Sequence, residues 1–539
     1  MFVQATTSKR GKKTYVSYLV RESFRTPQGP RSRTVCNITA LLPDVRELIA
    51  AALAGQPCAP LERVQLARAL DYGGLAVLRD AWERFGLDAV LAAVTDPRQR
   101  ALLQAMIFGR VLCPSSKRAL AEQAQGTLLA AACGLDPHRE TFDEDELYEA
   151  MDALNGHWVS LEKALYREAF PDAVSLVLYD LTSVYFEGKG PAGLGAYGYS
   201  RDHRPQVLLA LATDREGVPI HVEVLRGNRA DTTTLRALLH SLQRRFGLRE
   251  AVFVFDGGMS SRLNLEALRA EDLPFVTRLS AASLPEVLAA LPQDAQPGLW
   301  DRTKVLEVIV EGKRYVIAGG KERQQRDQAR RHARVAQAEA ELTRLAAVRR
   351  KTVDAQKLAS QAGRSLQRCK AHKYFDYRVD ADGRLHWQKK AALIEAEESR
   401  DGFYLLHTSL APAQSDTAQV RGHYKSLLAI EAAFGQLKSY LEVRPVYHFR
   451  PDRVRNHVRL CFLAYWLCAR LGQEWGARGE RGEVPRLLRR LQSIRVGTLQ
   501  VAGPAVRRLL TQIPPELNAL LERRGLLPLF AQPPSWAEA

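Results

Sequence analysis

Two aspartates occupy matching places in the sequence, each directly after a run of apolar residues. Asp180 follows "LVLY" and Asp256 follows "VFVF", and both runs are predicted to form buried strands. A charge at the inner end of a buried strand is unfavourable unless it is paired. Either each aspartate separately caps the turn after its strand, or the two carboxylates face each other. Two adjacent carboxylates repel, and a divalent cation between them removes the repulsion; carboxylate oxygens suit Mg²⁺ or Mn²⁺.

A third carboxylate, that of Glu431, belongs to a stretch at 424–445 that has helical periodicity. Positions seven residues apart on a helix differ by only about 20°, so Tyr424, Glu431 and Lys438 form one stripe. The apolar stripe beside it consists of Leu427, Ile430, Phe434, Leu437 and Leu441. Glu431 then lies at the edge of the core, where Gly435 leaves space and the carboxylate could reach a metal ion. The alternative is that Glu431 is an ordinary exposed residue, which is the usual place of a glutamate on a helix.

The elements that must position these residues begin with a run of strands. Strands are predicted at 175–180, 206–213, 218–225, 251–256 and 273–279, and helices are predicted to begin at Asp231, as a helix cap, and near Ser261. The order β-β-β-α-β-α-β is that of a ribonuclease-H-like core, in which the first and fourth strands are parallel neighbours. Because neighbouring strands lie about 4.8 Å apart, Asp180 and Asp256 are expected to face one point in space.

The segment that follows is predicted to be an insertion. It contains strands near 303–318, one long helix from about 321 to 372 and a hairpin around 380–383. Residues 321–373 hold 15 Lys and Arg against 5 Asp and Glu, so more than half of the chain's excess positive charge lies in this one element.

The basic helix has two interpretations. It either contacts DNA, with Arg330, Arg331 and Arg334 as candidate ligands, or it presents a solvated face. Two tryptophans of the insertion, Trp300 and Trp387, could stack on an unpaired base. A tryptophan in a strand is more often part of a hydrophobic core.

The predicted fold class is α/β, with a ribonuclease-H-like catalytic core interrupted by an inserted β and long-helix region. N-terminal β and helical regions precede the core, and a helical C-terminus follows it. The predicted parts are a β region (1–60), a helical region (61–170), the first part of the core (171–280), the insertion (281–415), the second part of the core with the Glu431 helix (416–475) and a helical region (476–539).

The charge of the chain indicates the class of its partner. The 539 residues carry a net charge of +17, which favours nucleic acid over an acidic membrane surface. The apolar run at 460–469 is too short to span a bilayer, which needs about 20 residues, and the N-terminal stretch lacks the apolar segment of a secretory signal. Seven cysteines without a C-x-x-C pair predict a reducing cytoplasm and no zinc site, with Cys461 and Cys468 as core thiols.

One glycine motif matches the pattern of a dinucleotide-binding site but is predicted not to form one. Residues 188–193, "GKGPAG", spell G-x-G-x-x-G after a strand, but a dinucleotide site needs a helix to follow at once and Pro191 interrupts this one. The loop that continues from it contains Arg201, His203 and Arg204. These three side chains either contact phosphate or line a solvated loop.

Taken together, these stretches resemble the D-D-E transposases of bacterial insertion sequences, in the group with the signature Tyr-x2-Arg-x3-Glu-x6-Lys. The matching stretches, in order within about 175–470, are "YDLTSVYFEG", "GYSRDHRPQ", "LRGNRADTTTL", "FDGGMSS" and "IEAAFGQLKSYLEVRPVYH". The resemblance implies that Asp180, Asp256 and Glu431 are a catalytic triad that binds Mg²⁺ or Mn²⁺. It also implies that Tyr424 and Lys438 are accessory residues near the DNA end.

The sequence departs from the signature at Leu427, which stands where the family has its arginine. Leu427 falls in the apolar stripe, so we expect it to serve packing. The resemblance implies a transposase that cuts and joins DNA ends, with terminal inverted repeats and target DNA as partners and a homodimer on paired ends. Residues 61–170 would bind the ends. The alternatives are a ribonuclease-H-like nuclease without strand transfer and an inactive DNA-binding protein derived from a transposase.

Overall fold

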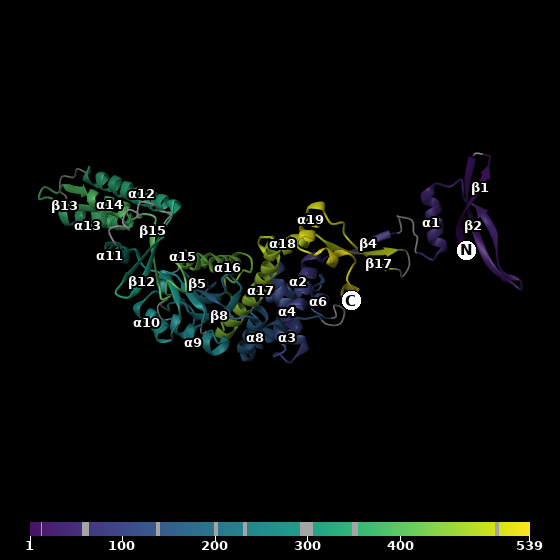
Figure 1. Cartoon of the computed structure of the whole chain (residues 1–539), viewed down its shortest axis with the longest axis horizontal. Helices are drawn as coiled ribbons and strands as arrows, with labels where there is room; N and C mark the ends of the chain where they lie inside the picture. The colour runs from purple at the N-terminus through teal and green to yellow at the C-terminus, as the bar shows by residue number, and fades with distance from the viewer. Residues whose placement is uncertain are drawn as a thin grey trace. The chain divides into compact units, whose positions relative to one another are not determined.

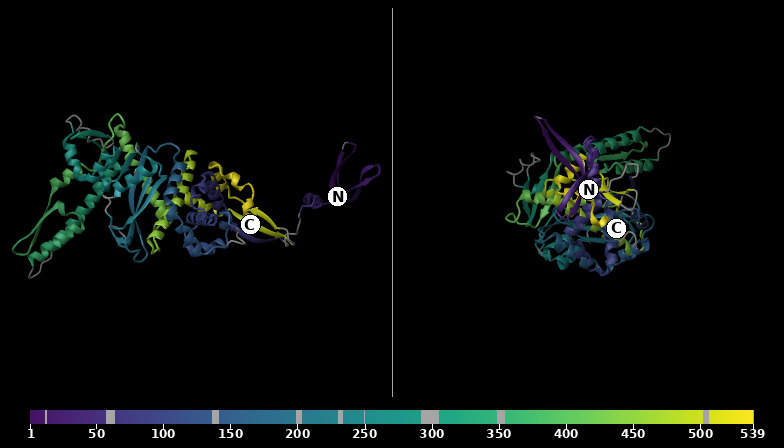
Figure 2. Two further views of the ribbon diagram at one scale, coloured as in Figure 1. Left: turned by 90° about the horizontal axis from the view of Figure 1, so that it is seen from below. Right: turned by 90° about the vertical axis from the view of Figure 1, so that its right-hand side faces the viewer.

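The computed structural model describes the chain except residues 12, 57–63, 136–140, 199–202, 230–233, 249, 292–304, 348–353, 502–505 and 539 (Figures 1 and 2). Its contacts divide the chain into two compact units. One unit comprises Met1–Gly74, Gly126–Leu128 and Leu491–Glu538, and the other comprises Leu75–Gln125 and Leu129–Arg490. Each unit is described by itself.

The first unit contains two small antiparallel sheets. One has the order β1-β2-β3 and confirms the predicted N-terminal β structure, while the other has the order β17-β16-β4. The elements are β1 (Phe2–Arg10), β2 (Lys13–Thr26), β3 (Gly29–Asn37), α1 (Pro43–Leu53), β4 (Val64–Asp71), β16 (Arg495–Val501), β17 (Val506–Leu510) and α19 (Pro515–Arg523). The prediction of a purely helical C-terminal region is therefore wrong. The stretch of β4, "VQLARALD", also alternates with period two, and pairing with β16 selects the strand.

The second unit is built on one large mixed sheet. Among the described residues it has nine strands, in the order β11-β12-β15-β10-β9-β5-β7-β6, with β8 pairing on β7. The strands are β5 (Leu176–Tyr185), β6 (Ala196–Tyr197), β7 (Pro205–Thr213), β8 (Pro219–Arg226), β9 (Val252–Phe255), β10 (Phe275–Arg278), β11 (Leu306–Val310), β12 (Lys313–Gly319) and β15 (Phe403–Thr408). The predicted order β-β-β-α-β-α-β is observed from β5 to β10 except that the two-residue strand β6 was not predicted, and β5 and β9 are parallel neighbours as expected.

Strand β5 is longer than the sequence predicted. It does not end at Asp180 but continues to Tyr185, because its antiparallel partner β7 extends that far. The parallel pairing with β9 stops at the pair Tyr179 and Phe255. Asp180 is therefore the first residue of β5 beyond its overlap with β9.

Helices cover both faces of this sheet (Figure 1). On one face, α9 (Thr234–Phe246) and α10 (Arg262–Ala270) bury leucines against Val177, Tyr179 and the phenylalanines of β9 and β10. Helix α10 begins as predicted, with Ser261 as its cap, whereas the predicted cap Asp231 lies outside the described residues. Helices α16 (Leu427–Ser439) and α17 (Pro451–Ala477) contact β5 and β8 respectively.

The region predicted to be helical before the core is helical from residue 73. Its helices are α2 (Gly73–Arg84), α3 (Leu87–Leu91), α4 (Pro97–Leu112), α5 (Lys117–Ala124), α6 (Leu129–Ala132), α7 (Glu144–Asp152) and α8 (Leu154–Ala169), and the core ends in α18 (Val484–Leu491). Helix α17 buries 15 of its 27 residues, including all of 460–468, and it contacts α4, α7 and α8, which explains its apolar run. Cys461 and Cys468 are buried in it as predicted. In the described parts of the chain no helix is both long enough and apolar enough to cross a bilayer.

The insertion differs from its prediction in two ways. The single long helix is two helices, α12 (Lys321–Ala346) and α13 (Ala355–Arg368), because apolar residues of both pack into one small core with the hairpin β13 (Phe375–Val379) and β14 (Leu385–Lys389). Strands β11, β12 and β15 extend the large mixed sheet, and α11 (Leu284–Ala289) covers them. The remaining helix is α14 (Ala391–Glu398). The helices and hairpin of the insertion lie together in both figures.

A buried carboxylate ties the helical region to the sheet. Glu162 of α8 is 0% exposed and accepts hydrogen bonds from His221 Nδ1 (2.9 Å), Val222 N (3.2 Å) and Arg245 (2.6 Å). Burial acts to raise the pKa of this carboxyl, but His221 and Arg245 outweigh it, so the pKa of Glu162 is lowered.

We expect Glu162→Gln to lower the free energy of unfolding by about 3 kcal/mol, because it breaks a buried ion pair from one side. A carboxyl whose folded pKa is lowered contributes stability above its unfolded pKa, about 4.3, that is lost as the pH falls through the folded pKa. Because the folded pKa of Glu162 lies below the unfolded value, the difference between parent and variant should stay constant above about pH 5 and shrink as the pH falls below about 4 in denaturant titrations. Glu266→Gln, which breaks the exposed pair with Arg262, should cost less than about 1 kcal/mol; an equal loss in both variants would contradict the assignment.

Candidate active site

The carboxyl ends of three parallel strands place three charged residues in one row. The register pairs Tyr179 of β5 with Phe255 of β9, and Phe255 with Thr277 of β10. The next residues along these strands are Asp180, Asp256 and Arg278. Since successive side chains point to opposite faces of a sheet, and Tyr179 and Phe255 face the core under α9 and α10, the three charged residues point to the other face.

Gly257 allows the three charged residues to lie this close together. A Cβ atom added to Gly257 would lie 2.8 Å from the carbonyl oxygen of Arg278, closer than a real Cβ approaches backbone. Glycine at 257 therefore lets the chain turn directly after Asp256 while the end of β10 passes beside it.

The helix that carries Glu431 is divided, where a single helix was predicted. Helix α15 (Thr417–Lys425) starts at a capping box made by Asp416 and Gln419, and α16 begins after Ser426. The predicted apolar stripe is confirmed, because Leu427, Ile430, Phe434, Leu437 and Leu441 are all buried. Glu431 is exposed beside this stripe, and nothing lies within 4 Å of a Cβ added to Gly435, so the predicted space beside Glu431 is present.

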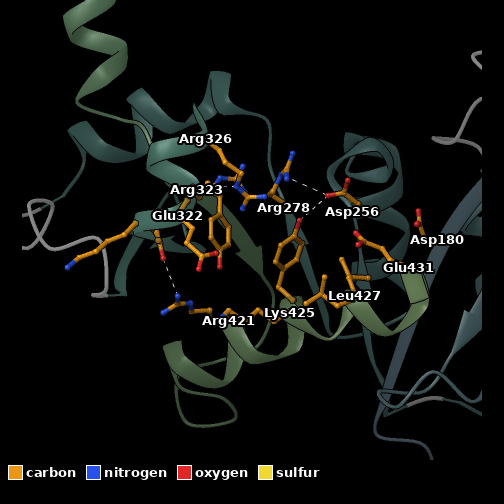
Figure 3. A pocket seen from close by; sticks show the side chains of 16 residues that line it. Asp180, Asp256, Arg278, Glu322, Arg323, Arg326, Arg421, Lys425, Leu427 and Glu431 are labelled. Atoms are coloured by element: carbon orange, nitrogen blue, oxygen red, sulfur yellow. Dashed lines mark hydrogen bonds and ion pairs between the residues drawn. The ribbon is translucent and has the colours of Figure 1, made fainter. Parts of the chain in front are cut away.

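A cavity of about 640 Å³ brings the three acidic residues together. Its lining contains Asp180 from β5, Asp256 after β9 and Glu431 from α16, and Figure 3 shows the Glu431 carboxylate pointing toward the two aspartates. The basic residues of the lining are Arg278, Lys321, Arg323, Arg326, Arg421 and Lys425. In Figure 3 Asp180, Asp256 and Glu431 lie at one end, and Arg323, Arg326 and Arg421 lie at the other end together with Glu322.

Tyr424 contacts the acidic end directly. Its hydroxyl donates to Asp256 Oδ1 (3.0 Å), and Arg278 Nε lies 4.0 Å from the same oxygen. Burial raises the pKa of Tyr424, and the Asp256 charge raises it further. The tyrosine therefore remains a hydrogen-bond donor, and it holds one oxygen of Asp256 in a fixed orientation.

The other two positions of the signature also have defined surroundings. Lys438 of α16 donates a hydrogen bond to Thr182, which is two residues beyond Asp180 on β5 and so on the same face. Leu427 is 8% exposed, which confirms that it packs, and it lines the cavity as well.

The donor set suits a hard divalent cation, because the acidic end offers only carboxylate oxygens from three separate elements. Asp180 Oδ1 also accepts from the Leu181 amide (2.8 Å), and Asp256 accepts from Tyr424 (3.0 Å). No three His, Cys, Asp or Glu side chains of the described residues are close enough to form a ready metal site. The ligand types therefore fit Mg²⁺ or Mn²⁺, and the three carboxylates line one cavity without closing around a common point.

The predicted DNA ligands outside the triad have different surroundings. Arg201 lies outside the described residues, and His203 is exposed. Arg204 forms an exposed ion pair with Glu187 (2.9 Å). The glycine motif at 188–193 is followed by no helix, as predicted, and leads to β6.

On α12, Arg331 is the clearest correction. It is 6% exposed and holds Asp401 through two hydrogen bonds, so it packs inside the insertion and is not a surface ligand for DNA. Arg330 is exposed and pairs with Asp327 (2.6 Å), and Arg334 is partly buried. Trp387 packs against the core of α12 and α13, so the alternative of a core tryptophan holds for it and not that of base stacking. Trp300 lies outside the described residues.

Sequence reasoning missed the basic part of the cavity. Arg278 lies near the end of the strand predicted at 273–279, and counting from the same strand position as the aspartates would have placed it in their row. The basic residues at the start of α12 and Arg421 of α15 could not be found this way. Their position at the cavity depends on how β12 and β15 extend the sheet.

Comparisons with known proteins agree with this architecture. The profile described as "Transposase DDE domain" matches residues 174–467, which is more than half of the chain. The chain therefore belongs to the transposase DDE domain family.

The solved structures that match parts of the chain include two transposase complexes. One is a piggyBac transposase synaptic complex with hairpin DNA (9% identity, 73% of this chain and 69% of that chain, TM-score 0.39). The other is a Mos1 transposase paired-end complex with the left transposon end (15% identity, 32% of this chain and 56% of that chain, TM-score 0.15). No curated protein sequence matches the chain significantly.

Gly257→Ala should disturb the row of charged residues. The added methyl group collides with backbone, so we expect a loss of about 1–3 kcal/mol in unfolding free energy together with weaker metal-dependent activity. Gly435→Ala is the matched control, because its methyl group enters open space within a helix and should stabilise by about 0.5–1 kcal/mol. Thermal unfolding of both variants decides the point; a Gly257→Ala protein as stable as the parent would mean that β10 does not pass so close to Asp256.

Proposed function

We propose that this protein is the DNA transposase of an insertion sequence, which cuts and joins the ends of its element by phosphodiester hydrolysis and transesterification. The observation that supports this most is the convergence of Asp180, Asp256 and Glu431, from elements up to 251 positions apart in sequence (431 − 180), on one cavity whose other end is basic. A ribonuclease-H-like core is the fold that we infer from the strand order.

In this proposal the three carboxylates hold divalent metal ions, Mg²⁺ or Mn²⁺. Such ions, when bound, activate an attacking water or 3′-hydroxyl and stabilise the leaving oxygen. Tyr424 orients Asp256 through its hydroxyl. Lys438 of α16 is held against Thr182, which lies two residues along β5 from Asp180, and so it places an ammonium near the DNA end.

Arg278 is the residue that we propose for the missing signature arginine. Leu427 offers no donor to a phosphate, but Arg278 reaches the same cavity from β10 with its side chain 36% exposed. A guanidinium binds phosphate through two parallel hydrogen bonds. It can therefore hold the cut strand against the metal site from the sheet side, where the family uses the helix side.

The partners in this proposal are double-stranded DNA, both as terminal inverted repeats and as target, and a second copy of the chain on paired ends. The net charge of +17 supports a polyanionic partner. Strand transfer separates this function from that of a ribonuclease-H-like nuclease that only cuts, and any metal-dependent cleavage separates it from an inactive DNA-binding protein.

The test uses the full chain and a supercoiled plasmid that carries its gene with the flanking DNA. Asp180→Asn, Asp256→Asn and Glu431→Gln should each lower Mg²⁺-dependent cleavage by at least about 10³-fold, the scale of losing a transition-state stabiliser. Binding of duplexes from the flanking DNA should remain within about twofold of the parent, and Ca²⁺ should support binding without cleavage. A variant that cleaves at the parental rate removes its residue from the triad, and a parent that cuts but never joins identifies the nuclease.

A second test moves the arginine from position 278 to position 427. Arg278→Ala should weaken end binding and slow cleavage by about 10- to 100-fold, the equivalent of one charge-assisted hydrogen bond. Leu427→Arg in the same protein should restore part of that loss, because both positions line one cavity. Arg262→Ala removes a charge that is exposed on α10 and serves as the control. If the double variant is no better than Arg278→Ala although it melts at the same temperature, the two positions do not serve one phosphate.

A further inference from the structure

A second group of cationic side chains lies outside the active-site cavity, where α4, α5, α7 and α17 meet. It consists of Arg110 at the end of α4, Lys117 at the start of α5 and Arg453 at the start of α17. Lys117 is only 6% exposed. A buried ammonium is costly unless a partner compensates it, so its surroundings decide what it does.

The described part of the chain supplies no such partner. No residue in the described ranges forms a hydrogen bond or ion pair with Lys117, and the contact that its ammonium makes is with the ring of Tyr148, whose centre is 6.0 Å away. Arg453 lies 4.4 Å from the same ring and is paired with Asp152 (3.0 Å). Arg110 donates to the Ser115 carbonyl (3.4 Å). Among the described residues, Asp152 is therefore the only carboxylate that pairs with any of the three cations, and it pairs with Arg453.

A small cavity opens on this group. It has a volume of about 10 Å³ and is lined by Arg110, Ser115, Ser116 and Lys117 together with apolar residues of α4, α5 and α17. The hydroxyl of Ser115 is buried there without a hydrogen-bond partner. Ser116 caps α5, whose N-terminal end favours negative charge. The volume is that of about one water-sized atom, which matches a single oxygen of a larger anion bound at the mouth.

We propose that Lys117, Arg110 and Ser115 form a phosphate-binding site that receives one non-bridging oxygen of a DNA backbone phosphate. This deepens the proposed function, on which it rests for the identity of the anion, and assigns one contact of the helical region to DNA. The site shares no lining residue with the active-site cavity, so it positions DNA and takes no part in cleavage.

The titration of the cluster gives this site a signature. Burial, with smaller contributions from Arg110 and Arg453, lowers the pKa of Lys117 to about 7 against an opposing effect of Cys461. The histidine, tyrosine and cysteine groups that face it stay uncharged near neutral pH, because burial lowers the pKa of His448 to about 3 and that of His457 well below its usual value, and raises the pKa values of Tyr148 and Cys461. The charged groups beside it are Arg110 and Arg453, and Asp152 pairs with Arg453. An anion favours the charged lysine, so DNA affinity should fall as the pH rises through about 7.

The experiment measures binding of a duplex from the gene-flanking DNA, by fluorescence anisotropy over a NaCl series and without divalent metal, so that the active-site carboxylates are not involved. Lys117→Met removes the ammonium and keeps the length of the side chain. We expect about tenfold weaker binding, a log–log salt slope smaller by about 0.9 and a loss of affinity between about pH 6.5 and 8.5 that is smaller than in the parent. Arg118→Met, which removes the neighbouring exposed charge that pairs with Glu122, is the control and should change the affinity less than twofold.

Inorganic phosphate distinguishes the source of the anion. If 10 mM phosphate raises the melting temperature of the parent but not of Lys117→Met, while the DNA affinities of the two proteins are equal, the site takes a free anion and the DNA assignment is overturned. Equal DNA affinity, slope and pH dependence with no phosphate effect overturn the site altogether. Because the parent's metal-dependent cleavage is measured separately, each of these results leaves the proposed function standing, whereas a parent that neither binds nor cleaves DNA removes both.

Discussion

The parallel register of β5, β9 and β10 is the constraint on which the site depends. It fixes Asp180, Asp256 and Arg278 as neighbours at the end of three strands, whatever their side chains do. Backbone hydrogen bonds between the strands hold the two aspartates and the arginine in these places. Together these bonds are far stronger than the repulsion between the two carboxylates. The core under α9 and α10 supports this arrangement, because Tyr179, Phe255 and their neighbours keep the opposite face of the same strands dry. A change of one residue in this register would turn all three charged groups into the core.

The sequence predicted the parts of the site that depend on local pattern. Apolar runs located the strands before Asp180 and Asp256, and the spacing of Leu427, Ile430 and Phe434 correctly oriented the helix that carries Glu431. These signals work because burial imposes periods of 2 and 3.6 on the chain. The resemblance to a transposase family grouped Asp180, Asp256 and Glu431 as one triad, and in the structure all three line one cavity.

The errors lie where distant segments decide the outcome. Residues 321–372 have a nearly continuous helical composition, and only the small core shared by Leu342 and Leu366 shows that the chain folds back on itself. Burial of Arg331 follows from the same event, since the fold places Asp401 opposite it. Strand β4 was taken as helix because its pairing partner, β16, is more than 400 residues away. Arg278 was overlooked because its importance comes from register, which a single sequence does not state.

The way the insertion is attached has a consequence for how this family can vary. It leaves the sheet after β10 and returns in β15, and these two strands are antiparallel neighbours, with Val276 paired to Thr408. The two ends are therefore joined by strand pairing, and described residues between 335 and 385 of the inserted segment share a core of their own. Closing a longer loop between fixed ends costs little entropy, only about 0.6 kcal/mol for each doubling of its length. The chain can thus gain, lose or exchange structure at this point during evolution while the catalytic strands remain undisturbed.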